Sequence, residues 1–177
     1  MTATDVIRPA KLAHVVLRTP QYEASVDWWM TVLGAERRYG NEFLTFLTYD
    51  DEHHRLAIVG IPQLGPNDRR AAGLEHVAFT YEDLDALLAT YERLAVAGIE
   101  PVAPIHHGMT VSMYYADPDG NQVELQVDAM TPDEAEAFMA SPVFDANPIG
   151  VRFDPAELVA RRAGGESIES LLAYPAP

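Results

Sequence analysis

The amino-acid sequence predicts an α+β fold built from two consecutive βαβββ modules and a short helical tail. The main observation is a repeated phrase, because LAHVVLRTP at residues 12–20 is followed later by LEHVAFTYE at residues 74–82. Each phrase reads as a strand, and each precedes an amphipathic helix pattern and three short strand patterns. Beyond residue 128 this order is replaced by helix-start signals.

The first module is predicted to span residues 11–59. Strand alternation places His14 and Val16 on the same face, and a helix begins at Pro20. The apolar residues of this helix recur at helical spacing, and Gly34 ends it. Three short strands should follow, at residues 36–39, 43–49 and 54–59.

The second module, residues 74–127, repeats this order. A strand at 74–80 leads into a helix whose leucines form one apolar stripe and which ends at Gly98. Residues 60–73 are interpreted as a linker, and residues 1–177 as a single domain. The remaining strands are predicted at 100–102, 110–116 and 121–127, with the turn sequence DPDG joining the last two.

The tail, residues 128–177, is predicted to form short helices. TPDEAEAFM at 131–139 and DPAELVARR at 154–162 each place a capping side chain before proline and acidic residues in the first turn. We expect these helices to pack on the domain, where they could partly cover a cavity.

Composition narrows the possible functions. The 177 residues are 48% hydrophobic with a net charge of −15, which is typical of a globular protein and argues against nucleic acid as a partner. The absence of cysteine excludes disulfides and thiolate metal sites, so a metal would have nitrogen and oxygen ligands. There is no apolar run of ~20 residues to cross a membrane and no signal-peptide core, and we expect a cytoplasmic protein.

Two histidines and one glutamate are candidate metal ligands. A histidine in a strand is more often a core or surface residue than a ligand, but equivalent strands of a repeat lie side by side and would bring His14 and His76 together. In the last strand Glu124 is the middle residue of a polar face, which would line a cavity or, in the simpler interpretation, meet solvent. The equivalent strand of the first module, RLAIV at 55–59, has no carboxylate, which favours one three-ligand site over two.

Two imidazoles and a carboxylate on adjacent strands form the facial triad that binds Fe(II) and leaves positions open for substrate and O2. The same ligand types accept Mn(II), so the sequence leaves the choice of metal open.

The paired modules resemble the vicinal-oxygen-chelate superfamily, which includes glyoxalase I, bleomycin- and fosfomycin-resistance proteins and type I extradiol dioxygenases. Two segments resemble the dihydroxybiphenyl dioxygenases in particular: DEHHRLA at 51–57 and VSMYYADPDGNQVELQ at 111–126. The resemblance implies one open mixed-sheet barrel around a metal site held by His14, His76 and Glu124. It implies a one-domain, Fe(II)-dependent enzyme that cleaves a catechol-type diol with O2, and a homo-oligomer.

The resemblance also implies roles for three further residues. His54 matches an acid–base histidine, whereas the neighbouring His53 is expected to be structural, with its side chain on the opposite strand face. Tyr114 matches a tyrosine that hydrogen-bonds the ring-cleaving intermediate, and alternation places it on the polar face of its strand. A further histidine of the family is either His106 or His107, and we favour His107 because flexible Gly108 follows it.

Two other functions remain possible from the sequence. A glyoxalase-like isomerase or lyase resembles a four-ligand metal site with a carboxylate or glutamine from each module, and the first module lacks its carboxylate. A non-enzymatic binding protein of the resistance kind would use an aromatic cleft, for which Trp28 and Trp29 are candidates, although one of the two fits the core stripe of its helix better. Metal content and oxygen uptake discriminate among the three.

Overall fold

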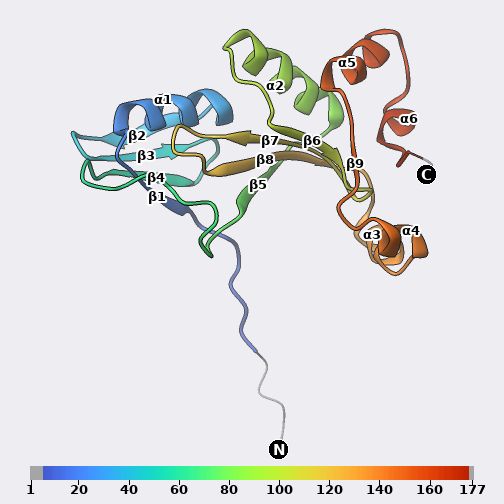
Figure 1. Ribbon diagram of the computed structural model, residues 1–177, viewed down its shortest axis with the longest axis horizontal. Coiled ribbons are helices and arrows are strands. Elements are labelled where there is room, and N and C mark those ends of the chain that lie inside the picture. The colour runs from blue at the N-terminus through green and yellow to red at the C-terminus, as the bar shows by residue number, and fades with distance from the viewer. Residues whose placement is uncertain (1–5, 176–177) are drawn as a thin grey trace, which may run out of the picture. The chain divides into compact units, whose positions relative to one another are not determined.

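The computed structural model describes residues 6–175, which form two compact units divided between Pro66 and Asn67. Each unit contains one β-sheet with a helix on one of its faces (Figure 1). None of the helices in residues 6–175 has the length and apolar character needed to span a bilayer.

The first unit is a βαβββ module with a mixed four-stranded sheet. The strand order is β1-β4-β3-β2, with β1 parallel to β4 and the other neighbours antiparallel. The chain order confirms the predicted pattern, with strand boundaries shifted by one to three residues, and β1 begins just after His14. Its elements are β1 (Val15–Thr19), α1 (Tyr22–Leu33), β2 (Glu36–Gly40), β3 (Leu44–Thr48) and β4 (Leu56–Gly60).

Helix α1 covers one face of this sheet because its apolar residues share one stripe. Val26, Trp29 and Val32 are buried there, and the helix packs against β4. The helix ends at Gly34, whose left-handed backbone (φ 60°) lets its N–H donate to the carbonyl of Met30.

The second unit repeats the topology and extends it by one strand. Its strand order is β5-β8-β7-β6-β9, with β5 parallel to β8 as β1 is to β4. The predicted duplication, and with it the α+β fold class, is confirmed; closure of the sheets into one barrel stays a prediction. The elements are β5 (His76–Thr80), α2 (Leu84–Val96), β6 (Ala103–His106), β7 (Thr110–Ala116), β8 (Gln122–Asp128) and β9 (Val151–Arg152).

The two faces of the second sheet differ sharply in character. Helix α2, capped by the Asp83 carboxylate on the Ala86 N–H, packs on the apolar face. The opposite face carries the alternate residues of β7 and β8, which are polar or titratable except for Ala116 at the end of β7. This alternation confirms the predicted polar face, and it leaves that face for chemistry because helix packing uses the other one. The buried side chains of β7 and β8 on the apolar face are Val111, Met113, Tyr115, Val123, Leu125 and Val127.

Strand β6 lies later in the chain than predicted. We expected a strand at 100–102, but the ladder with β7 runs from Ala103 to His106 and includes Pro104. Proline has no N–H to donate to a ladder and is uncommon inside a sheet. It is tolerated because β6 lies beside the sheet edge, flanked only by the two residues of β9.

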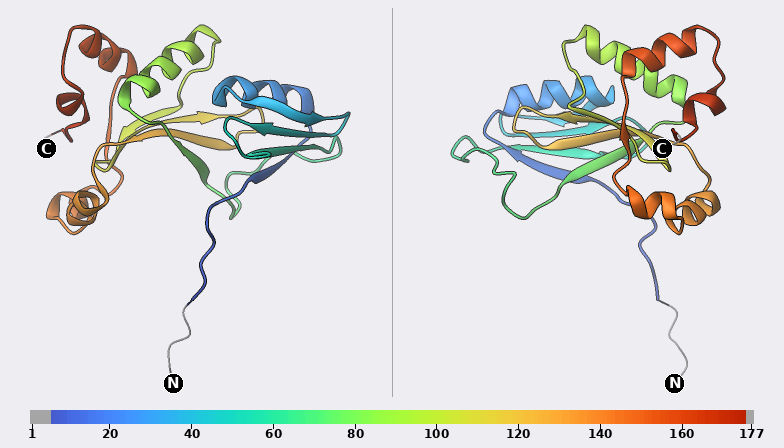
Figure 2. Two further views of the ribbon diagram at one scale, coloured as in Figure 1. Left: turned by 180° about the vertical axis from the view of Figure 1, so that it is seen from behind. Right: turned by 45° about the vertical axis from the view of Figure 1, so that its right-hand side comes forward.

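The tail packs around the second sheet as four short helices and strand β9 (Figure 2). Both predicted helix starts are confirmed: Thr131 and Glu134 form a capping box, and Asp154 caps the next helix through the N–H of Ala156. Arg162 joins the tail to α2 through a two-pronged ion pair with Asp85. The helices are α3 (Pro132–Met139), α4 (Pro142–Ala146), α5 (Pro155–Ala163) and α6 (Ile168–Leu172).

His106 is a buried histidine at the contact between the sheet and the tail. The N–H of Gly108 donates to its Nδ1 at 3.1 Å, so Nε2 carries the proton and donates to the Leu172 carbonyl at 3.1 Å. Burial lowers the pKa of His106 below its ordinary value, the charge of His107 acts in the same direction, and the bond to Leu172 opposes them. The imidazole is therefore held in its neutral form.

We predict that His106→Gln weakens the acid sensitivity of the fold. Because the native state disfavours a charged His106, the unfolded chain binds more protons below about pH 6.5, and the free energy of unfolding falls as pH drops through that value. Urea denaturation of metal-free protein at about pH 7.5 and about pH 5.5 measures the decline. We expect a smaller decline in the variant than in the wild type, and equal declines would contradict the assignment.

Candidate functional site

Four titratable side chains gather on the polar face of the second sheet: His76, His107, Tyr114 and Glu124. His76 is the first residue of β5, Tyr114 lies in β7, and Glu124 lies in the middle of β8. His107 follows the last residue of β6. These are four of the six residues that the sequence singled out for chemistry, and they come from four different strands or strand ends.

The ladder explains how these side chains meet. Tyr114 and Glu124 are direct partners in the antiparallel pair of β7 and β8, so their side chains leave the sheet on the same side. Glu124 pairs with Ala78 on its other side, and the small Ala78 leaves room for His76, two residues earlier on the same face. His76 Nε2 thus lies 3.0 Å from Glu124 Oε2.

His107 completes the cluster from the side of β6. Its Nε2 lies 3.0 Å from the Tyr114 hydroxyl and 4.0 Å from Glu124 Oε1. The main-chain N–H of His107 donates to the Thr110 carbonyl, which continues the β6–β7 ladder by one position. Each oxygen of the Glu124 carboxylate therefore faces one imidazole.

Glu124 is a buried carboxylate, only 5% exposed. Removing a carboxylate from water is costly unless cationic or hydrogen-bonding groups surround it. A divalent cation fits this requirement, because the Glu124 oxygen and the His76 nitrogen are a hard oxygen and an imidazole that converge on one point. Within residues 6–175, however, no group of three His, Asp or Glu side chains is placed to hold a metal.

Tyr114 is held as a neutral phenol. Burial raises its pKa, and the negative charge of Glu124 and a hydrogen bond to Glu124 raise it further. At neutral pH the hydroxyl consequently remains a hydrogen-bond donor on the polar face.

The side chains of His106 and His107 lie on opposite faces of the second sheet. His106 pairs with Val111, a core residue, so its ring lies on the apolar side and bonds to the tail. His107, one position later, lies on the side of Tyr114. Of the two histidines left open by the sequence, His107 is the one beside the candidate site residues.

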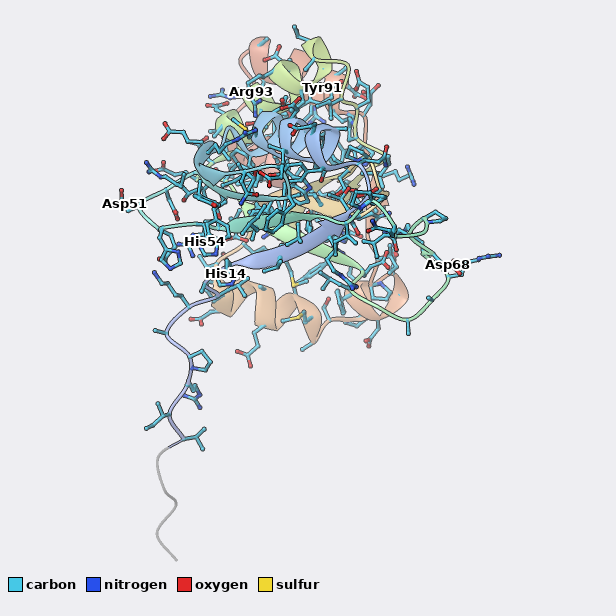
Figure 3. The ribbon with its side chains drawn as sticks, turned by 90° about the vertical axis from the view of Figure 1, so that its left-hand side faces the viewer. His14, Asp51, His54, Asp68, Tyr91 and Arg93 are labelled. Atoms are coloured by element: carbon cyan, nitrogen blue, oxygen red, sulfur yellow. The ribbon has the colours of Figure 1, made fainter. Side chains whose placement is uncertain are left out.

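In the first unit His14 and His54 lie next to each other, with ring centroids 4.3 Å apart (Figure 3). His14 immediately precedes β1, and His54 precedes β4, the parallel neighbour of β1. His54 also stacks on Phe46 at 4.4 Å with an interplanar angle of 13°. Burial lowers the pKa of His54, and the charges of His14 and His53 lower it further. His54 is thereby favoured in its neutral, proton-accepting form.

The expected direction of the His53 side chain, onto the strand face opposite to His54, is wrong. Its ring does not point away from His54, because the two Nδ1 atoms lie 2.6 Å apart. Strand alternation does not apply to this pair, because β4 begins only at Leu56 and His53 lies in a bend. His53 is nevertheless largely exposed, with 67% of its side-chain surface accessible.

Phe46 was missed by the sequence reasoning, and the repeat could have revealed it. In the first sheet Phe46 pairs with Ala57, as Tyr114 pairs with Glu124 in the second. The first module thus has the same scaffold with the polar pair replaced by an apolar one. The prediction of one three-ligand site rather than two rests on this same lack of a carboxylate in the last strand of the first module.

Comparison with known proteins identifies the family of the chain. The Glyoxalase/Bleomycin resistance protein/Dioxygenase superfamily matches residues 11–125. Over 176 residues the chain is 47% identical to biphenyl-2,3-diol 1,2-dioxygenase 2 of Rhodococcus globerulus, covering 98% of this chain and 90% of the relative. It is 46% identical over 158 residues to biphenyl-2,3-diol 1,2-dioxygenase 3 of the same bacterium, covering 87% and 83%.

A solved structure of a glyoxalase/dioxygenase from Nostoc punctiforme is similar in fold, with a TM-score of 0.58 at 20% identity over 72% of this chain and 99% of that one. Both the family match and the relatives, one of them aligned along nearly the whole chain, confirm the family predicted from the sequence. The protein belongs to the glyoxalase/bleomycin resistance protein/dioxygenase superfamily.

Proposed function

We propose that this protein is an Fe(II)-dependent extradiol dioxygenase, which opens a catechol-type ring beside its two hydroxyl groups and incorporates both atoms of O2. The observation that carries this function is the 47% identity, over almost the whole chain, to a biphenyl-2,3-diol 1,2-dioxygenase. A dioxygenase that acts at positions 1 and 2 of a 2,3-diol breaks a bond outside the hydroxylated pair, which is the extradiol position. A biphenyl diol or a smaller catechol is the expected substrate.

The metal ligands in this proposal are His14, His76 and Glu124. The 3.0 Å approach of His76 Nε2 to the buried Glu124 carboxylate supports two of them, and the sequence repeat supplies the argument for His14. Bound Fe(II) would hold the diol oxygens and O2 at neighbouring positions and pass electrons between them. Mn(II) suits the same ligands, and metal analysis decides between the two.

The side chains around these ligands have distinct roles in the proposed reaction. Tyr114 remains protonated and can donate a hydrogen bond to oxygen charge that develops during ring opening. His107, 3.0 Å from the Tyr114 hydroxyl, orients that phenol and can contribute its own ring to the same oxygen atoms. His54, neutral because of its lowered pKa, can accept a proton from the diol and later return it.

The alternative functions are less well supported. A glyoxalase-type site with a carboxylate from each module would need one at the position of Ala57, which is buried and apolar. For a resistance-type binder the aromatic pair is unsuitable, because Trp29 is buried in the core beneath α1. Oxygen uptake with a panel of catechols, together with the yellow ring-fission product, tests the dioxygenase directly; a metal-loaded protein that consumes no O2 with any of them would overturn the proposal.

We also expect the chain to be a homo-oligomer. Every residue of the edge strand β2 is exposed, and large apolar side chains of the first unit are exposed as well. Light scattering at micromolar concentration should give a mass that is a multiple of 19.5 kDa. A single-chain mass would contradict this expectation. Among these exposed side chains are Val16, Tyr39, Phe43 and Tyr49.

We predict that His14→Ala, His76→Ala and Glu124→Ala each lose most of the bound Fe(II) while staying folded. Removing one of three ligands leaves too few donors for tight binding. Anaerobic metal analysis and circular dichroism measure the two properties. Glu75→Ala and His53→Ala are matched controls, because these side chains are exposed, and both should keep the metal. Full iron occupancy in a ligand variant would remove that residue from the set.

We predict that His54→Gln keeps its iron and binds catechol but turns over ~10²–10⁴-fold more slowly, the usual contribution of a general acid–base group. The reason is that the diol proton loses its acceptor. His53→Gln, the same change at the exposed neighbour, should lose less than ~10-fold. Steady-state oxygen uptake compares them. Equal rates would refute the role of His54, and loss of metal in the His54 variant would mean that the ligand set is wrong.

A further inference from the structure

The C-terminal tail surrounds the short segment that carries His107. This segment, residues 106–108, leaves the sheet at the end of β6 and contains Gly108 in a left-handed conformation with φ 91°. Three separate parts of the tail contact it. We propose that the tail positions His107 for the reaction, with His106 and Phe138 as the positioning residues through which it acts. This inference rests on the proposed function, in which His107 acts beside Tyr114.

The first contact is the ring of His106. Its two nitrogens are both used, Nδ1 by the N–H of Gly108 and Nε2 by the carbonyl of Leu172 at the end of α6. The ring also meets Tyr174 edge to face, with centroids 5.3 Å apart. One buried imidazole thus bonds the residue after His107 to the far end of the tail.

The second contact is Phe138 of α3, which lies against Gly108. A Cβ atom at Gly108 would overlap the Phe138 ring, so the ring packs directly on the main chain of the segment. Phe138 is itself held by two further aromatic rings, with centroids 5.4 Å from Tyr174 and 5.7 Å from Phe144. Gly108 is therefore required both by its backbone angle and by the close approach of the ring.

The third contact is the turn before β9. A Cβ atom at Gly150 would overlap the carbonyl of His106, so this turn lies directly on the main chain before His107. Asn147 fixes the turn by accepting from the N–H of Gly150 and donating to its carbonyl. The two-residue ladder then pairs His106 with Val151 and Ile105 with Arg152.

These contacts hold the main chain on both sides of His107. Its own ring needs to stay within hydrogen-bond distance of Tyr114, and reacting groups tolerate misplacement of only about 1 Å before rates fall by ~10²-fold. A glycine next to His107 would otherwise let the segment sample many conformations. The three contacts of the tail remove that freedom.

A purely structural tail would give a different result from a positioning tail, and a double-mutant cycle distinguishes them. His106→Asn keeps an acceptor near Nδ1 but cannot reach Leu172, and Phe138→Leu removes the ring from Gly108 while retaining apolar volume. If each acts through His107, each lowers kcat by ~10-fold or more with its iron content unchanged and its KM altered by less than ~3-fold. In a His107→Ala background the same changes lower kcat by less than ~2-fold further.

Arg162→Gln is the matched control within the tail. It breaks the ion pair between α5 and Asp85 of α2, which is separate from the three contacts on residues 106–108. Its kcat should stay within ~2-fold of the wild type. The proposal would be overturned if His106→Asn and Phe138→Leu lowered kcat by the same factor whether or not His107 is present. A fall in kcat of the same size in Arg162→Gln would also overturn it. If one of these two variants does not fold, the double-mutant cycle is completed with the other.

A measurement without activity separates this proposal from the proposed function. In metal-free protein with ¹⁵N-labelled histidine, His106 should show a slowly exchanging Nε2–H, as its bond to Leu172 requires. Phe138→Leu should shift or broaden the ring signals of His107 and leave those of His54 unchanged. Unchanged His107 signals in this variant would refute positioning even if the enzyme is active. If no catechol is cleaved, the proposed dioxygenase function is refuted. The His107 signals still decide whether the tail positions His107.

Discussion

Glu124 places a carboxylate in the middle of a sheet, almost entirely out of water, and the rest of the polar face is arranged around that charge. An ionised group in such a position needs partners, and it has an imidazole on each oxygen and a phenol opposite in the ladder. The same two strands direct their other side chains into the core beneath α2. Strand alternation therefore lets one pair of strands hold a polar cluster and anchor a helix at once.

The duplicated scaffold separates architecture from chemistry. Both modules have the same strand order and the same parallel pair, yet the partners Tyr114 and Glu124 in one sheet correspond to Phe46 and Ala57 in the other. The first module consequently has no buried charge at that position. Its titratable rings instead lie just before strands β1 and β4, where His14 and His54 are in contact. The same fold can thus gain or lose a charged site through two substitutions on one ladder.

The tail shows how an addition to a fold can affect a site that it does not form. Strand β9 covers the edge of the second sheet, and α5 is tied to α2, which are stabilising contacts of an ordinary kind. The contacts on residues 106–108 are different because they converge on a single turn beside the polar cluster. His106 links the two roles, since burial among these contacts keeps its ring neutral, and the bonds of that ring to Gly108 and Leu172 restrain its neighbour.

The sequence by itself determined the repeat, the fold class, the family and the face on which Tyr114 and Glu124 lie, because helix and strand periodicity are local properties of the chain. It misplaced β6, which contains Pro104, and the ring of His53, which lies in a bend outside the strand. Only the tertiary structure decided that His107 rather than His106 lies beside Tyr114, and that Phe46 stacks on His54. The two-residue strand β9 and the tail's contacts with residues 106–108 also came from the structure alone. These depend on pairings between residues far apart in the chain, where a shift of one residue moves a side chain to the opposite face.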